Sequence, residues 1–392
     1  MTFFTPSRFT LYGSQLLDQH IQRDLRMIVQ SLRERWPEHT IEAIVLSGGY
    51  GRGEGGVLRK NGQEYPFDDY DLLVVFRQIR SADLQAYNTS LHNAAQALSQ
   101  RTAFKVDIAP ACDIESLRKA PFNLFWYELR HGHKVIWGRP EVMENLPDFP
   151  DAELPASEAF KLLLNRGVEL WRVIEAGIPL RETWLDIRWE PLLMALHNAV
   201  ISIGDSLLIL NQQYHWSYQE RVQILKRYFQ QGHGLPEASM LTFLYPEAIQ
   251  YKLSPSDYRD LPVEWVVGKL EVVRKLFLNY FYFSLQHLGM PVQNVQTAYP
   301  EAVKAHLYHR PGLRQRWQNF QQNRTYFKSW DWASAWNWHP PHLRFLAALP
   351  YLLENGALEP GPELAGLFPG CGAQPDLDTL RQFFEREWKM IL

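Results

Sequence analysis

The sequence has little cysteine, no excess of basic residues and no long uninterrupted apolar run. Its two cysteines, Cys112 and Cys371, cannot build a disulfide framework and lack the paired spacing of a zinc site, which indicates a reducing compartment. Forty basic and 43 acidic side chains give a formal net charge of −3, which excludes a global basic field for nucleic acid or anionic lipid. The N-terminus lacks the basic start and apolar run of a signal peptide, and apolar stretches such as Leu207–Leu210 and Phe277–Phe283 are too short to span a bilayer. We therefore expect a cytoplasmic protein with no membrane partner.

The sequence does contain enough apolar material for more than one core. Its 392 residues are 46% apolar and 21% charged, which is the profile of a folded globular chain. Pro147, Pro150 and Pro155 mark a linker. Strand and helix patterns alternate before this point, whereas helical patterns dominate after it. The sequence predicts an α+β protein with one domain at 1–150 and a mostly helical domain at 151–392.

The first 140 residues alternate between the period of a helix and that of a strand. Residues 14–35 place leucines and isoleucines on one helical face, and the short apolar run at 41–49 ends in glycines. Because the predicted strands are separated by helices, we expect a sheet with helical cover. The other predicted strands span 69–76, 104–111 and 134–137, and the other predicted helices span 81–100 and 122–131.

The second half of the sequence predicts helices almost throughout. Ser217 followed by Glu220 fits a capping box at the start of one of them. A stretch rich in glycine and proline at 355–376 is expected to form a loop. The predicted helices span 156–176, 189–212, 217–231, 236–251 and 263–287, with weaker patterns at 298–307, 341–354 and 377–390.

One segment combines several glycines in a pattern that suits phosphate binding. The run SGGYGRGEG occupies positions 47–55, at the end of the first predicted strand. Consecutive glycines there let a phosphate chain approach the backbone, because no Cβ stands in the way. If a helix follows, its free N–H groups and positive dipole end face that anion. A glycine cluster on its own is more often a simple turn.

Three acidic residues accompany two of the predicted strands. Asp69 and Asp71 stand two apart in DYDLLVVF, so their carboxylates project from the same face. Two such carboxylates repel each other unless a divalent cation lies between them. Asp107 is a lone acid in the strand predicted at 104–111, and if that strand neighbours the first, three carboxylates converge at one sheet edge. Such a set suits two Mg²⁺ ions that hold a nucleoside triphosphate for in-line displacement.

Each of these acids also has a purely structural explanation. A D-x-D pair is usually solvated surface, although here it leads directly into the apolar run Leu72–Val75. Asp107 alone fits a half-exposed strand acid. The combination of three acids in this order, each attached to a strand, favours a catalytic site over those explanations.

With these motifs, the segment 40–140 resembles the DNA polymerase β-like nucleotidyltransferase superfamily. That superfamily has a strand, Gly-Gly or Gly-Ser, a helix, D-x-D on the next strand and a third acid later in the chain. The string GGYGRGE is most similar to the uridylyltransferases that modify nitrogen-signalling proteins. The His-Asp dipeptide of their associated hydrolase domain does not occur in this sequence, and the chain leaves no room for their paired regulatory domains.

The resemblance implies a role for each residue that matches its motif. Gly48 and Gly49 would contact the triphosphate, and Asp69 and Asp71 would be metal ligands. Asp107 would be the remaining ligand, near the attacking group and acting as its base. The implied cofactor is Mg²⁺, with two ions in the site.

Two further residues of the glycine run are candidates for nucleotide binding. Arg52 matches a basic position of the GGYGRGE string and would help to hold the phosphates or the loop. Many members of the superfamily carry a hydroxyl residue after the first glycine, where this chain has Gly49. Ser47 stands just before the glycine pair and is the second candidate for nucleotide binding.

Two segments lie outside the motif. Residues 57–67 lengthen the spacing between the glycines and the acids and predict a hairpin or flap that carries Arg59 and Lys60. The stretch 302–338 interleaves arginines and lysines with aromatic residues, a combination that binds RNA by charge and stacking. The same combination equally covers a domain interface, and the net charge favours this second interpretation.

The sequence thus predicts a Mg²⁺-dependent nucleotidyltransferase that moves an NMP from an NTP donor to a hydroxyl-type acceptor. The acceptor class stays open between a small molecule such as an aminoglycoside or sugar, a protein side chain and a tRNA end. The alternative from another class is a catalytically silent nucleotide-binding or partner-binding module on the same fold. The intact acid triad argues against that alternative, because a decayed site loses carboxylates first.

Overall fold

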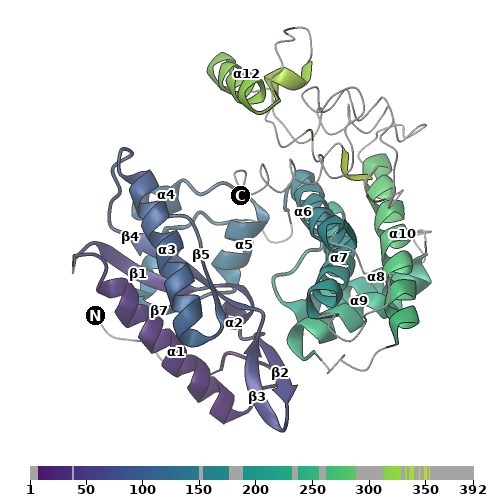
Figure 1. Ribbon diagram of the computed structural model, residues 1–392, viewed down its shortest axis with the longest axis horizontal. Coiled ribbons are helices and arrows are strands. Elements are labelled where there is room, and N and C mark those ends of the chain that lie inside the picture. Colours follow the sequence, from purple (N-terminus) through teal and green to yellow (C-terminus); the bar gives the residue numbers. More distant parts are fainter. Residues whose placement is uncertain are drawn as a thin grey trace. The chain divides into compact units, whose positions relative to one another are not determined.

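The computed structural model describes most of the chain up to residue 287 and parts of the remainder (Figure 1). The helices predicted weakly at 298–307 and 377–390, most of the one at 341–354, and the loop predicted at 355–376 lie outside the described residues. The described residues are 8–37, 39–149, 153–175, 189–231, 237–255, 262–287, 312–327, 332, 335–339, 344, 348–350 and 353.

The chain divides into two compact units. The first unit comprises Met1–Pro155, Asn211–His233 and Ser239–Asp260, and the second comprises Ala156–Leu210, Gly234–Ala238 and Leu261–Leu392. The domain predicted at 1–150 therefore makes up most of the first unit. Two helices from the segment predicted as the second domain group with that first unit instead. They are α8 (Tyr218–Gln230) and nearly all of α9 (Ala238–Leu253).

A five-stranded mixed sheet forms the centre of the first unit. Its strand order is β5-β4-β1-β7, and β6 pairs with the later part of β4. β1 is antiparallel to β4 and β7, whereas β5 and β6 run parallel to β4. A mixed sheet with helices agrees with the α+β class predicted from the sequence. The strands are β1 (Ile41–Leu46), β4 (Asp69–Phe76), β5 (Lys105–Ile108), β6 (Cys112–Asp113) and β7 (Lys134–Gly138).

Two long helices pack on this sheet through one continuous apolar core (Figure 1). They are α1 (Gln15–Arg33) and α3 (Leu84–Thr102). α1 begins after Ser14, whose side chain accepts a hydrogen bond from the N–H of Leu17 and so caps the helix. All six residues of β1 are buried, which is typical of a strand covered on both faces.

The strand predicted at 104–111 is interrupted in the structure. Ala109 still donates to the carbonyl of Leu72 on β4 at 2.8 Å, but the N–H of Ala111 donates to the side chain of Asn88, so the ladder stops after β5 and resumes at β6. Asp113, at the end of β6, accepts a hydrogen bond from the N–H of Ser116 and caps a short helix. In the first unit, the short elements that the sequence patterns did not indicate are β6, α4 (Ile114–Arg118) and the 3-10 helix η1 (Pro140–Asn145).

The segment between the glycines and the acids forms a hairpin, as predicted for 57–67. β2 (Gly56–Lys60) and β3 (Gln63–Phe67) pair antiparallel in a two-stranded sheet of their own. Asn61 and Gly62 at its tip both have positive φ, 53° and 75°, which is the backbone of a tight two-residue turn.

Arg59 of β2 anchors this hairpin to other parts of the first unit. Its guanidinium donates to the carbonyl of Tyr12 at 2.5 Å and to the hydroxyl of Ser254 at 2.9 Å. It also pairs with Glu64 across the hairpin at 3.1 Å. The arginine that the sequence placed on a flap therefore holds the hairpin in place.

Helices make up the described part of the second unit. Within it, α7 contacts both α6 and α10. One window of α7, Pro191–Leu210, is long and apolar enough to span a membrane by length and composition, which the sequence analysis did not expect. Its mean hydropathy is 1.7, and 94% of the window is buried within the fold, as in the core helix of a soluble protein. The elements are α6 (Ala156–Glu175), α7 (Trp189–Leu210), α10 (Val263–His287), α12 (Leu313–Phe327) and η3 (Ala335–Trp338).

Candidate functional site

The turn after β1 is fastened to the acidic strand. β1 ends at Leu46, and the short helix α2 (Gly48–Arg52) starts directly after Ser47. Ser47 donates twice to the backbone carbonyl of Asp71 on β4, from its N–H at 2.8 Å and from its hydroxyl at 3.2 Å. The hydroxyl of Ser47, a candidate for nucleotide binding, thus bonds to the fold itself.

Gly48 makes the closest approach between this turn and the acids. Its φ of 59° lies in the left-handed region, and a Cβ there would overlap the Oδ2 atom of Asp71. At Gly49 a Cβ would lie 3.2 Å from the carbonyl oxygen of Glu54, so that glycine faces its own loop. Both glycines are partly exposed. The position of the Asp71 carboxylate therefore requires a glycine at position 48 and not at position 49.

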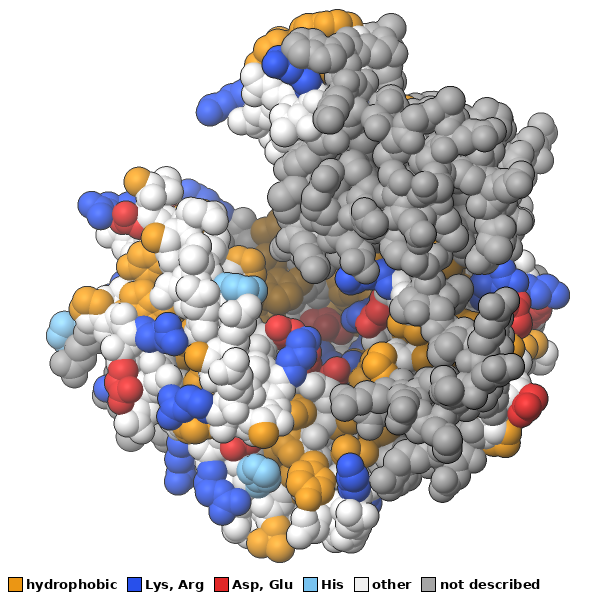
Figure 2. Space-filling view, viewed as in Figure 1, with side chains coloured by type: hydrophobic (Ala, Val, Ile, Leu, Met, Phe, Trp, Pro, Cys, Tyr) orange, Lys and Arg blue, Asp and Glu red, His pale blue; other side chains and the backbone are white. Residues whose placement is uncertain are grey.

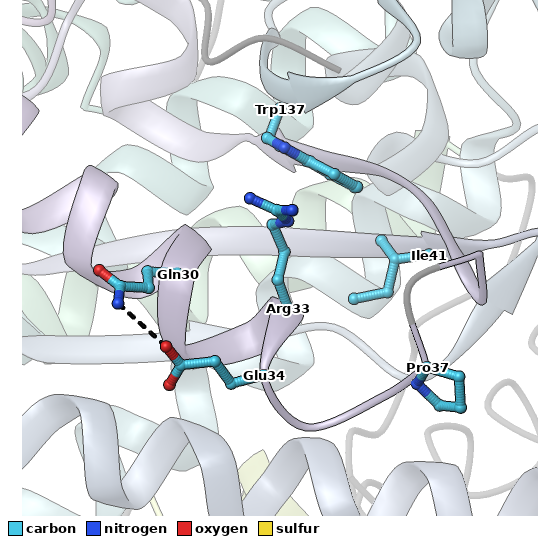
Figure 3. A pocket seen from close by; sticks show the side chains of 6 residues that line it. All are labelled: Gln30, Arg33, Glu34, Pro37, Ile41 and Trp137. Carbon is cyan, nitrogen blue, oxygen red and sulfur yellow. Dashed lines mark hydrogen bonds between the residues drawn. The ribbon is translucent and has the colours of Figure 1, made fainter.

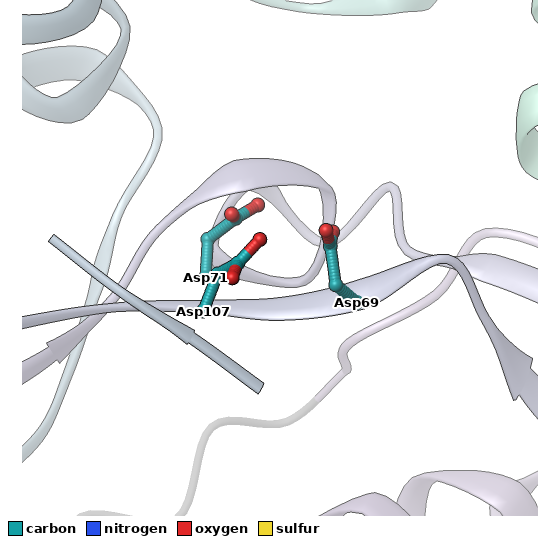
Figure 4. A group of neighbouring side chains, drawn as sticks. All are labelled: Asp69, Asp71 and Asp107. Atoms are coloured by element: carbon teal, nitrogen blue, oxygen red, sulfur yellow. The ribbon is translucent and has the colours of Figure 1, made fainter. Parts of the chain in front are cut away.

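The structure brings Asp69, Asp71 and Asp107 together on one face of the sheet. β5 runs parallel to β4, with Asp71 opposite Asp107 in the strand register. The three carboxylates point to the same side of the strands (Figure 4), and each offers an oxygen that lies within 4.8 Å of those of the other two. β4 and β5, which carry the three acids, are therefore neighbours in the sheet. This was the condition under which the sequence predicted that the three carboxylates converge.

Crowding disfavours the charged forms of these carboxylates. Burial, followed by the charges of Asp69 and Asp68, raises the pKa of Asp71 to about 7. Burial and the charge of Asp68 also raise the pKa of Asp69, although Lys105 opposes that shift. Asp107 differs in exposure, because 54% of its side chain is accessible compared with 15% for Asp69. Negative charge is in surplus here, and a bound cation would reduce it.

Two lysines and a fourth acid lie at the same place, and the sequence analysis identified none of them. Lys105, opposite Asp69 in the register, donates to Asp69 at 2.8 Å and to Asp107 at 2.5 Å. Lys252 of α9 donates to Asp68 at 2.5 Å. The spacing of Lys105 two positions before Asp107 was a usable signal, because such residues share a strand face. No local pattern indicates that α9 reaches the acids.

The donor set suits a hard divalent cation. Carboxylate oxygens are the ligands that Mg²⁺ and Ca²⁺ prefer in proteins. Within the part of the chain that the structure describes, Asp69, Asp71 and Asp107 are the one group of three acidic, histidine or cysteine side chains close enough to share an ion. The triad can hold a metal ion, and its oxygen donors fit Mg²⁺ and other hard cations alike.

Arg52 belongs to a separate, buried ion cluster. Its side chain is 3% exposed and lies 3.3 Å from Glu128 of α5 (Leu124–His131) and 3.6 Å from Glu54. Its guanidinium also lies over the ring of Tyr218, 4.7 Å from the centroid. The resemblance left two roles open for Arg52, which were to hold the phosphates or to hold the loop. These contacts serve the second role.

Glu54, the last residue of the GGYGRGE string, caps α8. Its carboxylate accepts from the hydroxyl of Ser217 at 2.6 Å and from the backbone N–H of Tyr218 at 2.9 Å. Ser217 in turn accepts from the N–H of Glu220 at 3.4 Å, which is one half of the predicted capping box. The carboxylate of Glu54 therefore lies at the N-terminus of α8, where the helix dipole favours a negative charge. This effect does not depend on how far Glu54 lies from α8 in the sequence.

A second buried arginine balances this cluster. Arg221 of α8 donates to the hydroxyl of Tyr214 at 2.8 Å, and that hydroxyl donates to Glu128 at 2.5 Å. Arg221 also lies over the rings of Tyr218 and Tyr214, 4.4 and 4.9 Å from their centroids. Two arginines and two glutamates thus share one buried neighbourhood with no surplus charge.

The described part of the basic and aromatic stretch 302–338 packs its rings against one another. Phe320 stacks on Trp332 with centroids 4.3 Å apart and also contacts the ring of Trp338 at 4.9 Å. Basic side chains are scattered among neutral and acidic ones on the face drawn in Figure 2. Trp317 and Trp332 are 46% and 54% exposed, so these contacts do not decide between a domain interface and an RNA site. Lys304, Arg310, Lys328 and Trp330 lie outside the described residues.

A pocket of about 430 Å³ lies at the opposite end of β1 from the glycines (Figure 3). Within it, Arg33 lies over the ring of Trp137, 4.9 Å from the centroid, and Gln30 donates to Glu34 at 2.9 Å. None of the residues that line this pocket is a predicted site residue. The pocket is therefore separate from the carboxylates.

Comparison with known proteins adds no family assignment. No protein-family model matches the chain, and no curated protein matches it significantly. Function is therefore inferred from the motifs and from the geometry of the first unit.

Proposed function

We propose that this protein is a Mg²⁺-dependent nucleotidyltransferase, which transfers an NMP from an NTP donor to a hydroxyl-type acceptor. The observation that carries the proposal is the grouping of Asp69, Asp71 and Asp107 on one face of two parallel strands, with oxygens within 4.8 Å of one another. Gly48 adds a turn without a side chain directly beside Asp71. Carboxylates crowded in this way repel one another and destabilise the fold unless a bound ligand offsets their charge.

The order of elements supports the same activity. A strand, a glycine pair, a short helix, a D-x-D strand and a third acid follow one another in the first unit. This order is similar to that of the polymerase β-like superfamily. We infer a catalytic domain of that type, to which α8 and α9 belong, and a helical unit that contributes to acceptor binding. The acceptor is a small molecule, a protein side chain or a tRNA end.

The residues of the site divide into two tasks. Asp69 and Asp71 would hold Mg²⁺ with Asp107 as the third ligand, and bound Mg²⁺ would neutralise charge on the carboxylates and on the triphosphate. Gly48 and Gly49 leave the backbone of the turn open to phosphate, because neither residue carries a side chain.

Asp107 is the best placed of the three acids to face the acceptor. More than half of its side chain is exposed, whereas Asp69 is largely enclosed. In the transfer, the acceptor oxygen attacks the α-phosphorus, the bond from that phosphorus to the bridging oxygen breaks, and pyrophosphate leaves. Asp107 accepts the proton of the attacking hydroxyl.

A thermal-shift screen of the four NTPs with and without Mg²⁺ tests the proposal. We expect at least one NTP to raise the Tm of the first unit when Mg²⁺ is present and not in its absence. A ligand at one hundred times its Kd stabilises a protein by about 2.7 kcal/mol, which such a screen detects. Asp71→Asn is the matched control, and we expect it to lose the Mg²⁺-dependent shift.

The same screen addresses the silent-module alternative when it is joined to a turnover assay. Pyrophosphate release with a panel of acceptors of the three classes, abolished by Asp71→Asn, would establish transfer. Stabilisation by an NTP without any release would favour a silent nucleotide-binding module. If no NTP stabilises the protein in any combination with Mg²⁺, the proposed function is wrong.

A further inference from the structure

The charged side chains of β4 and β5 form a square in the strand register. Asp69 stands opposite Lys105, and Asp71 stands opposite Asp107. The Nζ atom of Lys105 lies 2.5 Å from Asp107 on its own strand and 2.8 Å from Asp69 on the neighbouring strand. The ammonium group therefore joins two of the three clustered carboxylates.

An ammonium group in this position does part of the work of a metal ion. It contacts carboxylates from two strands and reduces the repulsion between them. It carries one positive charge where a divalent ion carries two, and it binds by hydrogen bonds rather than by coordination. We infer that Lys105 is the counter-ion of the metal-free site and that a divalent cation must displace its ammonium group to bind Asp69 and Asp107. The inference rests on the proposed function, because it takes these carboxylates as metal ligands.

Lys105 is placed so that its ammonium group can leave. Its side chain is 60% exposed, and the charge sits at the end of a flexible four-carbon stem. Val106, the next residue, is buried in the core on the other face of the strand. The backbone of β5 therefore stays fixed by Val106, and release of the ammonium group needs only a change of side-chain rotamer.

Lys252 provides a natural comparison for Lys105. It pairs with Asp68 at 2.5 Å, and its side chain is 18% exposed. Asp68 is not one of the three clustered ligands. Removal of either lysine deletes one positive charge close to the acids, but Lys105 is bonded to ligand atoms of the cluster. Variants of the two lysines thus distinguish direct competition with a metal ion for the carboxylates from the general effect of a nearby positive charge.

Binding of Mn²⁺ in the absence of nucleotide tests this inference, with free Mn²⁺ measured by electron paramagnetic resonance. We expect Lys105→Met to bind Mn²⁺ about three- to tenfold more tightly than the wild type, as for the loss of two partly exposed ion pairs. Lys105→Arg keeps the charge and should stay within about twofold of the wild type. Lys252→Met should gain less than Lys105→Met, and Lys119→Met, which removes a lysine paired with Glu115, should be unchanged.

The outcomes separate this inference from the proposed function. Equal or weaker Mn²⁺ binding by a folded Lys105→Met protein overturns the inference. An equal gain in Lys105→Met and Lys252→Met also overturns it, since that result indicates a general field rather than displacement. If Lys105→Met does not fold, Lys105→Gln carries the same expectation. Absence of Mn²⁺ binding in every protein, wild type included, also overturns the inference, whereas the proposed function is tested separately by the screen of NTPs with and without Mg²⁺.

Discussion

Two charged clusters in the first unit use similar residues in opposite ways. In the cluster around Arg52, two arginines face two glutamates in a buried neighbourhood. In the cluster around Asp71, four carboxylates face two ammonium groups, and side chains such as Lys105 and Asp107 reach solvent. Balanced, buried charge holds a fold together, whereas surplus charge that reaches solvent is available to a ligand.

The pKa values of the two clusters differ for the same reason. Burial and the charges of Asp69 and Asp68 raise the pKa of Asp71 to about 7, and the charge of Lys252 does not offset them. Burial alone would lower the pKa of Arg52, but the charge of Glu128 raises it above its ordinary value. The charges of the cluster around Arg52 balance without any ligand, whereas the cluster around Asp71 keeps a surplus of negative charge.

The largest effect is expected from breaking the balanced cluster. Arg52→Met removes a buried positive charge that lies beside the buried Glu54 and the half-buried Glu128, and we expect it to lower the free energy of unfolding by about 3–5 kcal/mol. Arg59→Met is the matched control, because it removes an arginine whose side chain is half exposed and should cost about 1 kcal/mol. Urea unfolding of both variants measures the difference. If the Arg52→Met protein has normal stability but no longer binds NTP, Arg52 binds phosphate and does not mainly stabilise the fold.

The next effect concerns the turn beside the unbalanced cluster. Gly48→Ala forces a Cβ against Asp71 at a left-handed φ, and we expect it to cost about 1–3 kcal/mol and to weaken Mn²⁺ binding. Gly49→Ala should cost less than about 1 kcal/mol, because its Cβ meets one backbone oxygen at 3.2 Å. Thermal unfolding and Mn²⁺ titration of the two variants test this order. Equal losses at both positions would contradict it.

Removal of charge from the unbalanced cluster should stabilise the metal-free protein. Below about pH 4, Asp71 is protonated in both the folded and the unfolded chain. Between about pH 4 and pH 7 only the folded chain keeps that proton, so stability falls as the pH rises through this window. We expect Asp71→Asn to raise the free energy of unfolding by about 1–3 kcal/mol at pH 8, with a gain that shrinks toward pH 4, and to abolish transfer.

Unfolding experiments across this pH range check the prediction for Asp71. Asp148→Asn, at a carboxylate that is 97% exposed, should show no such dependence. A loss of stability at pH 8 in Asp71→Asn would mean that the Asp71 carboxylate is satisfied within the fold.

The smallest effect on stability is expected at Asp107. Because its side chain is more than half exposed, Asp107→Asn should change the free energy of unfolding by about 0.5 kcal/mol or less. Transfer should nevertheless fall by about a hundredfold or more, while NTP binding with Mg²⁺ is largely retained through Asp69 and Asp71. Nucleotide titration and turnover of the same variant test this separation. Normal turnover would remove Asp107 from the catalytic set.

Much of the fold could be predicted from the sequence, because it follows from local patterns. The strand at 69–76 has the predicted bounds, since two acids lead into an unbroken apolar run. The five helices predicted between 156 and 287 lie within a few residues of their predicted ends, whereas α12 was not predicted as a helix. The break at Pro110 and the two-residue strand after it were missed, since so short an element has no period of its own.

The candidate site was predictable where its residues share a motif and not where distant segments meet. Asp69, Asp71 and Asp107 stand in or next to recognisable strands, so their convergence could be stated as a condition. Lys252 joins the site from α9, far along the chain, which no local pattern encodes. The motif left Arg52 open between the phosphates and the loop, and no local pattern indicates its partners, which come from helices α5 and α8.

The cap that Glu54 forms on α8 has a consequence for the order in which the chain can fold. Glu54 and its partner Ser217 are 163 residues apart, so a ribosome must complete the whole intervening segment before this contact can form. Until then Arg52 and Glu54 lack their partners from α8, and closing so long a loop is slow. We expect pulse-labelled hydrogen exchange to find the backbone N–H of Tyr218, which donates to Glu54, protected only after this long loop has closed. A fragment that stops at the end of the predicted first domain should therefore keep the bond from Ser47 to β4 but leave Glu54 without the helix that it caps.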